Sequence, residues 1–374
     1  MNTAQETLDA VMLYLKESKI PGKHKIDRSK FKSKANSVKK KLPFLLDVKL
    51  KKDKDAYDWG DMIKFVTQSK FMPPWQADPT YSRFQGENFL TDNEIATIGA
   101  WVDNGMERGD PNVEPQFPDF PTGSVLGTPD LVLEMSEAYL HRGTNQDNYR
   151  YFVLPSGLTQ DRIVKAVEFR PGNTQIVHHA LNFEDQTGQA AANDAATPEY
   201  GFDGFGSFLG GNQADILNQK QYPGYVPGQK PILYPDGVGQ VLHAGADVVV
   251  QLHYAPWPVD APDKSKVNIF FADEEEEEIE RFVDDRIMLP FDLPGGFFSF
   301  ILPPNQKREF HGTWTLNEDR SLIGLSPHMH YLGTDWEVWL EDPDGNKVNM
   351  IKIENWDFNW QGGYYFTRLI PALQ

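Results

Sequence analysis

The chain has 374 residues, of which 40% are hydrophobic and 13% aromatic, the composition of a globular protein with room for two or three cores. Its net charge of −18 argues against a large nucleic-acid-binding surface, because phosphate contacts need basic patches. The absence of cysteine excludes disulfides, zinc–thiolate sites, covalently attached c-type haem and thiol nucleophiles.

Residues 1–110 are predicted to form a mostly helical domain. Its clearest helix starts at Thr91, where Glu94 three residues later completes a capping box, and Gly105 ends it. Shorter amphipathic turns are expected at residues 7–15 and 61–66. A linker rich in proline and glycine follows at residues 111–127.

Charged residues are distributed unevenly along the chain. Residues 1–56 hold 15 basic and 7 acidic residues, a net of +8, so the remaining residues have a net charge of −26. The basic segment is either a docking site for a protein partner or a solvated surface. No run of apolar residues approaches the roughly 20 that a membrane span needs, and no signal peptide is recognisable at the start.

The pattern changes to short strands after the linker. The 30 glycines and 27 prolines favour many turns, and we predict a mainly β fold of two tandem antiparallel β-sandwiches. The first sandwich is expected at residues 128–272 and the second, apparently truncated, at residues 273–374. The acidic run at residues 274–278 is a solvated loop or, alternatively, a calcium-binding loop. Strand-like runs lie at residues 131–135, 248–253 and 337–340.

Five of the nine histidines lie in three short clusters with apolar, strand-like surroundings. Without cysteine, a metal at these clusters must be held by imidazole, carboxylate or thioether. Imidazole ligands suit copper well, while zinc and iron remain possible. The clusters are V-H-H-A with His178 and His179, Q-L-H-Y with His253, and P-H-M-H with His328 and His330.

The spacing of the histidines decides what each cluster can bind by itself. On a strand, His328 and His330 would point to the same face about 6.5–7 Å apart, so both rings can hold one ion. His178 and His179 would point to opposite faces unless the backbone bends. His253 lies in a strongly apolar run, which by itself favours a core histidine over a metal ligand.

The order of these motifs resembles the copper type II ascorbate-dependent monooxygenases, the family of peptidylglycine α-hydroxylating and dopamine β-monooxygenases and their bacterial relatives. The sequence is similar over residues 128–374, and the ordered set H-H, Q-L-H-Y and P-H-M-H-Y-L-G is more specific than any single motif. Further segments similar to the bacterial relatives are residues 148–155, 170–173, 237–240 and 357–361.

The resemblance implies two sandwiches with one copper each. His178, His179 and His253 match the electron-donating copper site, and His328 and His330 match two ligands of the oxygen-binding site, where O2 is used to hydroxylate a C–H bond. Ascorbate is the implied reductant. The substrate would be a small molecule or a peptide, and the family is usually exported, which implies a periplasmic or extracellular protein.

Two departures from the family pattern affect this interpretation. The family's third ligand of the oxygen-binding copper is a methionine that follows the D-F-N-W-Q region, and neither Met329 nor Met350 matches it. The helical region resembles a cytochrome c-like domain in which the methionine of M-P-P-W binds haem. Here Met72 has no C-x-x-C-H partner motif, so no haem is expected and a packing role is predicted.

Three hypotheses follow from the sequence. The first is a copper- and ascorbate-dependent monooxygenase, and the second is a non-catalytic copper-binding or interaction protein on the same scaffold. The third is a structural β-sandwich protein with histidines in its core. His243 is a candidate neighbour of the first copper, because it lies ten residues before His253, whereas His24 and His141 are expected at the surface.

Overall fold

The computed structural model describes residues 56–107, 123–204, 207–209, 219–273, 278–284, 301–316, 318–358 and 360–372. The helical turn expected at residues 7–15, the basic segment before residue 56, most of the linker and all but the last residue of the acidic run lie outside the described residues. The chain divides into two compact units, Met1–Trp75 with Glu87–Phe120 and Gln76–Gly86 with Pro121–Gln374. Among the described residues, no helix has the length and hydropathy to cross a membrane.

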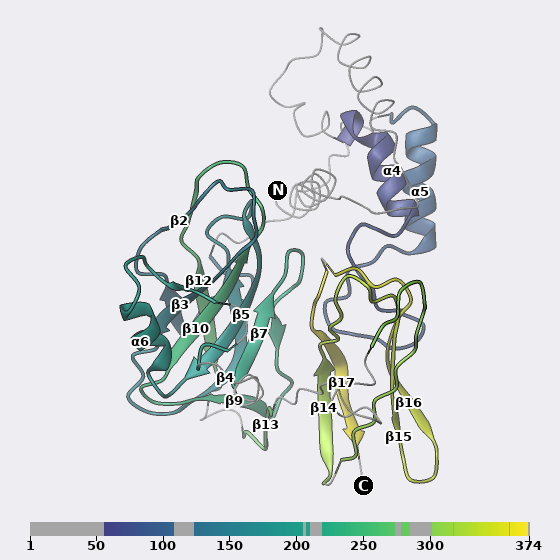
Figure 1. The fold of residues 1–374 in the computed structure, drawn as a ribbon. Helices are drawn as coiled ribbons and strands as arrows, with labels where there is room; N and C mark the ends of the chain where they lie inside the picture. The colour runs from purple at the N-terminus through teal and green to yellow at the C-terminus, as the bar shows by residue number, and fades with distance from the viewer. Residues whose placement is uncertain are drawn as a thin grey trace. The chain divides into compact units, whose positions relative to one another are not determined.

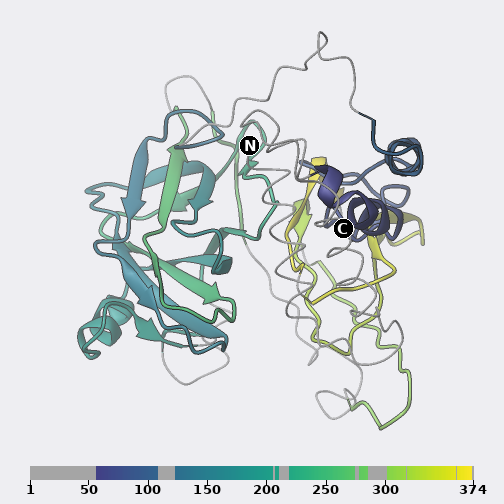
Figure 2. The same cartoon turned by 90° about the horizontal axis from the view of Figure 1, so that it is seen from above.

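Two helices form the described part of the first unit. α4 spans Gly60–Gln68 and α5 spans Asp92–Asp103, and Figure 2 views them, in purple and blue, nearly along their axes. The predicted capping box of α5 is confirmed, because the Glu94 amide donates to the Thr91 hydroxyl and the Glu94 carboxylate accepts from the Thr91 amide. Met72 is 3% exposed, so it is buried, as its expected packing role requires.

The prediction of a mainly β fold is confirmed, since all the described strands lie in the second unit, where α6 (Gln189–Ala195) is the one described helix (Figure 1). One sheet contains β1 (Leu131–Glu134), β4 (Arg162–Arg170), β8 (Ile232–Leu233), β9 (Val238–Leu242), β12 (Lys266–Phe271) and β13 (Arg281–Phe282). Its strand order is β1-β12-β4-β9-β13, with β8 beside β4.

A second sheet contains β3 (Asn148–Pro155), β5 (Val177–Asp185), β6 (Phe202–Asp203), β7 (Gln221–Tyr225) and β10 (Asp247–Tyr254). Its strand order is β6-β3-β10-β5-β7. The helix α6 follows β5, and a short pair, β2 (Tyr139–His141) with β11 (Ala261–Asp263), accompanies the two sheets.

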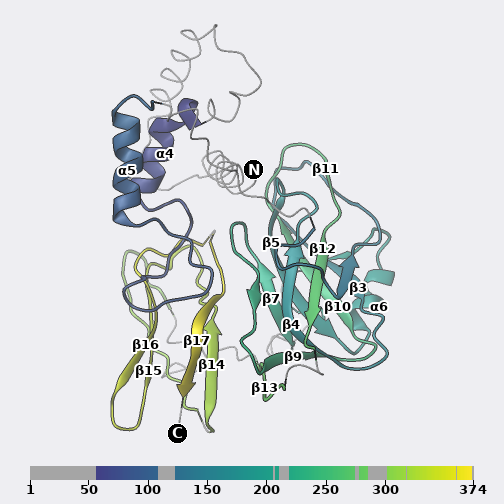
Figure 3. The same ribbon diagram turned by 180° about the vertical axis from the view of Figure 1, so that it is seen from behind.

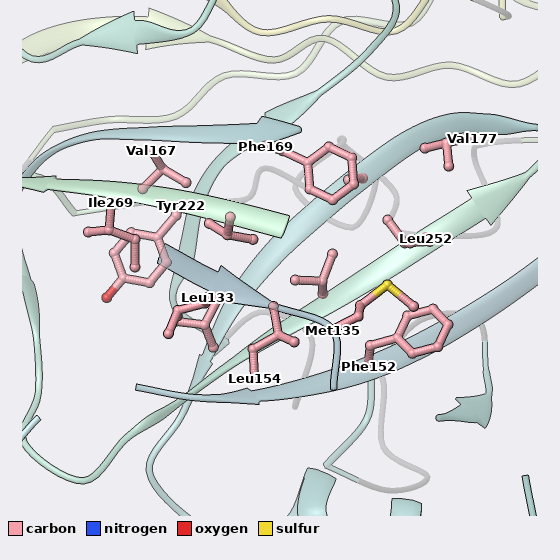
Figure 4. Packing of buried hydrophobic residues seen from close by; sticks show 14 of the residues in the cluster. Leu133, Met135, Phe152, Leu154, Val167, Phe169, Val177, Tyr222, Leu252 and Ile269 are labelled. Carbon is pink, nitrogen blue, oxygen red and sulfur yellow. The ribbon is translucent and has the colours of Figure 1, made fainter. Parts of the chain in front are cut away.

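The side chains of β10 point alternately to the two faces of its sheet, and those on one face help to form a core shared by the two sheets. Val248, Val250 and Leu252 are buried in the main hydrophobic cluster together with residues of the other sheet. Figure 4 shows this packing, with Leu252 and Phe152 on one side and Phe169 and Ile269 on the other. The intervening residues of β10 therefore point to the opposite, outer face of the five-stranded sheet.

A smaller cluster covers part of that outer face. Val249 of β10 packs there with Tyr151, Phe183, Ala190 and neighbouring aromatic residues. Because Ala190 belongs to α6, the helix and the chain that follows it cover this part of the sheet. His253, four residues further along β10, lies on the same face beyond the cover.

The C-terminal part of the second unit contains two antiparallel strand pairs, seen from behind in Figure 3. β14 (Arg320–Leu325) pairs with β17 (Tyr364–Ala372), and β15 (Trp336–Glu341) pairs with β16 (Lys347–Ile353). The residues of β15 alternate between exposed and half-buried, the pattern of a strand with one solvated face. That these pairs belong to a second sandwich stays a prediction.

Gly172 allows a close backbone crossing just before β5. A Cβ atom at this position would lie 2.4 Å from the carbonyl carbon and oxygen of Lys264. We therefore expect Gly172→Ala to lower the free energy of unfolding by about 1–3 kcal/mol, the usual cost of overpacking. Urea denaturation would measure this loss. Gly123→Ala is the control, because no described atom lies within 4 Å of the Cβ it would add; equal losses in both variants would contradict the prediction.

Candidate metal centre

A β-bulge brings His178 and His179 to the same side of the sheet. His253 lies opposite His179 in the ladder between β10 and β5, whereas the next residue, Tyr254, lies opposite Val177. His178 is therefore the additional residue of a bulge, a local bend that redirects side chains. The sequence left open whether two adjacent histidines could share an ion, and the bulge meets the condition that the backbone must bend.

The three rings direct their Nδ1 atoms toward one another. Nδ1 of His179 lies 3.2 Å from Nδ1 of His178 and 3.3 Å from Nδ1 of His253. Imidazole nitrogens bound at about 2.0–2.1 Å with tetrahedral angles lie about 3.3 Å apart. The donor atoms of all three side chains fall within 4.8 Å of one another. The spacing fits one metal ion held by three imidazoles, and the chain has no thiol to compete for it.

Asp147 fixes the orientation and tautomer of His253. Its Oδ1 atom accepts a hydrogen bond from Nε2 of His253 at 2.6 Å, which leaves Nδ1 of that ring with a lone pair for the metal. This hydrogen bond is also the main cause that lowers the pKa of Asp147. No pattern in the sequence marks Asp147 as a partner of His253, because the pairing that places Tyr149 opposite His253 is set by the fold.

Tyr149 covers one side of the centre. Its ring is stacked on that of His253, with 4.2 Å between the centroids and 4° between the planes. Burial, followed by the nearby charge of Asp147, raises the pKa of Tyr149 to about 12. The phenol therefore stays neutral at physiological pH, and its ring packs against one face of the His253 imidazole.

The surroundings keep two of the three imidazoles neutral. Burial, followed by repulsion from His253, lowers the pKa of His178 to about 4. The same two causes, in the same order, place the pKa of His179 well below its usual value, and His178 and His328 contribute further. Since a metal binds the deprotonated imidazole, these rings are ready to bind at mildly acidic pH.

This neutrality predicts a metal affinity that changes little with pH. Three ligands with the ordinary histidine pKa of about 6.5 would together lose about 10⁴-fold in affinity between pH 7 and pH 5, or about 25-fold each. Because their pKa values are lowered, His178 and His179 are protonated less than ordinary histidines over that range, so we expect a loss well below 10⁴-fold. A chelator competition corrected for the chelator's own protonation would measure it, and a 10⁴-fold fall would contradict the expectation.

His328 and His330 form a second, separate pair. They lie in the extended segment after β14, with ring centroids 4.9 Å apart and planes at 84°. Nδ1 of His328 donates to Oε1 of Gln361, which leaves Nε2 of that ring for a metal. The ring of Phe358 is stacked on that of His330 at 5.9 Å. Within the described residues, the structure groups no third histidine or carboxylate with this pair.

The methionines near this pair have other surroundings. A Cβ at Gly333 would lie within 2.9 Å of the Cβ, Sδ and Cε atoms of Met329, so this side chain is folded against Gly333. Met350 is 2% exposed within β16. The structure therefore gives no reason to assign either thioether to the pair.

Two histidines lie in places that the sequence did not suggest. His243 contacts Glu184, with 2.5 Å between Nδ1 and Oε1, and Glu184 lies five residues beyond His179 on β5. That separation corresponds to about 17 Å along a strand, so His243 is no neighbour of the first centre. His141 is 2% exposed and stacked on Tyr254, which corrects the expectation of a surface residue.

Comparisons with known proteins do not place the chain in a family. A scan against protein-family models found no match, and neither did a search of curated proteins. The two groups of histidines, the first centre and the pair at His328 and His330, are therefore the main basis for a functional interpretation.

Proposed function

We propose that the protein is a copper- and ascorbate-dependent monooxygenase that hydroxylates a C–H bond. The observation that carries the proposal is the convergence of three Nδ1 atoms on a β-bulge, at separations that fit one ion. The motif order that resembles the copper monooxygenases is the second support. The same resemblance leads us to propose a periplasmic or extracellular location.

The donors favour copper among the metals that imidazole binds. Both groups consist of histidine rings, and neutral imidazole suits copper, zinc and iron. Only copper and iron among these can exchange electrons with ascorbate. Iron sites of oxygenases usually add a carboxylate ligand, and none is grouped with the three histidines within the described residues.

The proposed reaction assigns a different role to each group. Copper bound at both sites would supply the one-electron chemistry by which ascorbate delivers two electrons, while one atom of O2 enters the C–H bond and the other leaves as water with two protons. His178, His179 and His253 would hold the ion that supplies an electron, with Asp147 keeping His253 in the binding tautomer. His328 and His330 would hold the ion that supplies the chemistry for O2 and a small-molecule or peptide substrate.

The alternative is a copper-binding protein without turnover. The observation in its favour is the pair at His328 and His330, which has no third histidine or carboxylate within the described residues. Such a protein would bind one ion tightly at the first centre and serve in copper storage or in an interaction.

A copper titration distinguishes the two functions. The purified chain is titrated with Cu(II), bound ions are counted, and O2 consumption with ascorbate is followed with and without candidate C–H substrates. Two ions and substrate-dependent turnover support the monooxygenase. One ion without turnover supports the alternative, and no bound copper refutes both.

A further inference from the structure

A segment from between the two helices completes the C-terminal β region. We call Gln76–Gly86 the strap; it follows α4 and precedes α5 in sequence, yet it belongs to the second compact unit. The amide of Asp78 donates to the carbonyl of Lys352 at 2.8 Å, and the amide of Gln85 donates to that of Tyr365 at 2.7 Å. The strap thereby joins β16 to β17, two strands that do not pair with each other in the described sheets.

Burial holds the strap in place. Phe84 is 3% exposed and forms a bridge with Phe366 of β17. Its ring is stacked on that of Phe366 and lies edge-on to that of Tyr364, each with 5.3 Å between centroids. Ala77, also 3% exposed, forms a bridge with Ile353 of β16. The strap is therefore an integral part of this region's core.

Gln76 makes three hydrogen bonds to the loop between β16 and β17, which we call the β16–β17 loop and which is described for residues 354–358 and 360–363. Its Oε1 atom accepts from the amide of Asp357 at 3.1 Å. Its Nε2 group donates to the carbonyls of Asp357 at 3.0 Å and Trp360 at 2.9 Å. One side chain thus satisfies three backbone groups of the loop, using both donors and an acceptor of its amide.

The same loop supports both histidines of the second pair. Gln361 accepts from Nδ1 of His328 through Oε1 and donates through Nε2 to the carbonyl of Phe358 at 2.8 Å. Phe358 in turn is stacked on His330, with 20° between the ring planes. The tautomer of His328 and the position of His330 therefore depend on where the β16–β17 loop lies.

We propose that Gln76 is a positioning residue for the metal site at His328 and His330. It fixes the β16–β17 loop, the loop presents Gln361, and Gln361 keeps the proton of His328 on Nδ1 so that Nε2 is free. The inference rests on the proposed function in assigning a metal to this pair. Gln76 would thereby support this metal site although it precedes His328 by 252 positions in the sequence. The segment between the two helices would then be required for metal binding at the second pair.

The test compares Gln76→Ala with Gln85→Ala. Gln85 lies in the same strap, but its side chain donates to the carbonyl of Phe366 and touches β17 rather than the loop. Long-range ¹H–¹⁵N spectra of histidine rings, recorded without metal, report the tautomer of His328. We expect the Nδ1–H form in the wild type and in Gln85→Ala, and a mixture of tautomers in Gln76→Ala.

Metal binding gives the second readout. Gln76→Ala should weaken copper at the second site about 10-fold, the lower end for loss of an outer-shell partner, and leave the first site unchanged. Gln76→Glu keeps the chain length and the acceptor for the Asp357 amide but loses both donors, so it should act in the same direction if the alanine variant does not fold.

The outcomes separate this inference from the proposed function. An unchanged His328 tautomer in both Gln76 variants overturns the positioning role, as does an equal effect of Gln85→Ala. If the wild type binds no metal at the second pair, the proposed function fails there, while the tautomer measured without metal still decides the role of Gln76.

Discussion

His179→Ala should strongly weaken metal binding at the first centre while leaving the second site unaffected. His179 is the middle donor, because its Nδ1 atom is the one that lies 3.2–3.3 Å from both other Nδ1 atoms. Its loss leaves two imidazoles, and we expect affinity to fall by more than the roughly 10–100-fold that removal of an outer-shell partner costs. Chelator competition and a count of bound ions would measure the change.

His243→Ala provides the control for that experiment. His243 is also a histidine of the first sandwich, but it contacts Glu184, which keeps hydrogen bonds from Tyr222 and Gln186 after the substitution. We expect this variant to bind copper as the wild type does. Full copper binding by His179→Ala would contradict the three-histidine centre, and loss of the first ion in His243→Ala would contradict the placement of His243.

The sequence was sufficient to predict the strand that carries His253. The apolar, β-branched run at residues 248–253 predicts a strand, and the structure places it in β10 with Val250 and Leu252 in the core. His253 is then on the outer face by the period of two. This part is predictable because strand period and burial are local properties of the chain.

The bulge at His178 could not be predicted in the same way. A bulge depends on the register between β5 and β10, whose residues are more than 60 positions apart in the sequence. The pattern H-H is compatible with one ring on each face or with both on one face, and only the pairing of Tyr254 with Val177 decides between them.

Polar partners of the histidines were missed for a similar reason. Asp147, Gln361 and Gln76 have no local pattern that marks them, and the contacts of Gln76 span 281 and 284 positions. His141 was expected at the surface because histidine is polar, yet its ring is stacked on buried Tyr254. The placement of these side chains depends on tertiary contacts, which the periodicity of apolar residues in the sequence does not reveal.

His328→Ala should abolish the second metal and substrate-dependent O2 consumption and leave the first metal bound. Within the described residues this pair has two imidazoles, with ring centroids 4.9 Å apart, so loss of one leaves a single ring, which cannot hold an ion against the solvent. The first centre keeps all its donors, because its hydrogen bonds and bulge involve β3, β5 and β10. Ion counts and oxygen uptake would measure both effects.

Met329→Leu is the matched variant for the same site. Met329 lies between the two histidines in sequence, but its side chain is folded against Gly333, and leucine has a similar volume. We therefore expect this variant to keep both ions and the wild-type rate of oxygen uptake. Loss of the second ion in Met329→Leu would make the thioether a ligand and contradict its placement. Loss of both ions in His328→Ala would contradict two separate sites, because His328 would then be required for metal binding at the β-bulge.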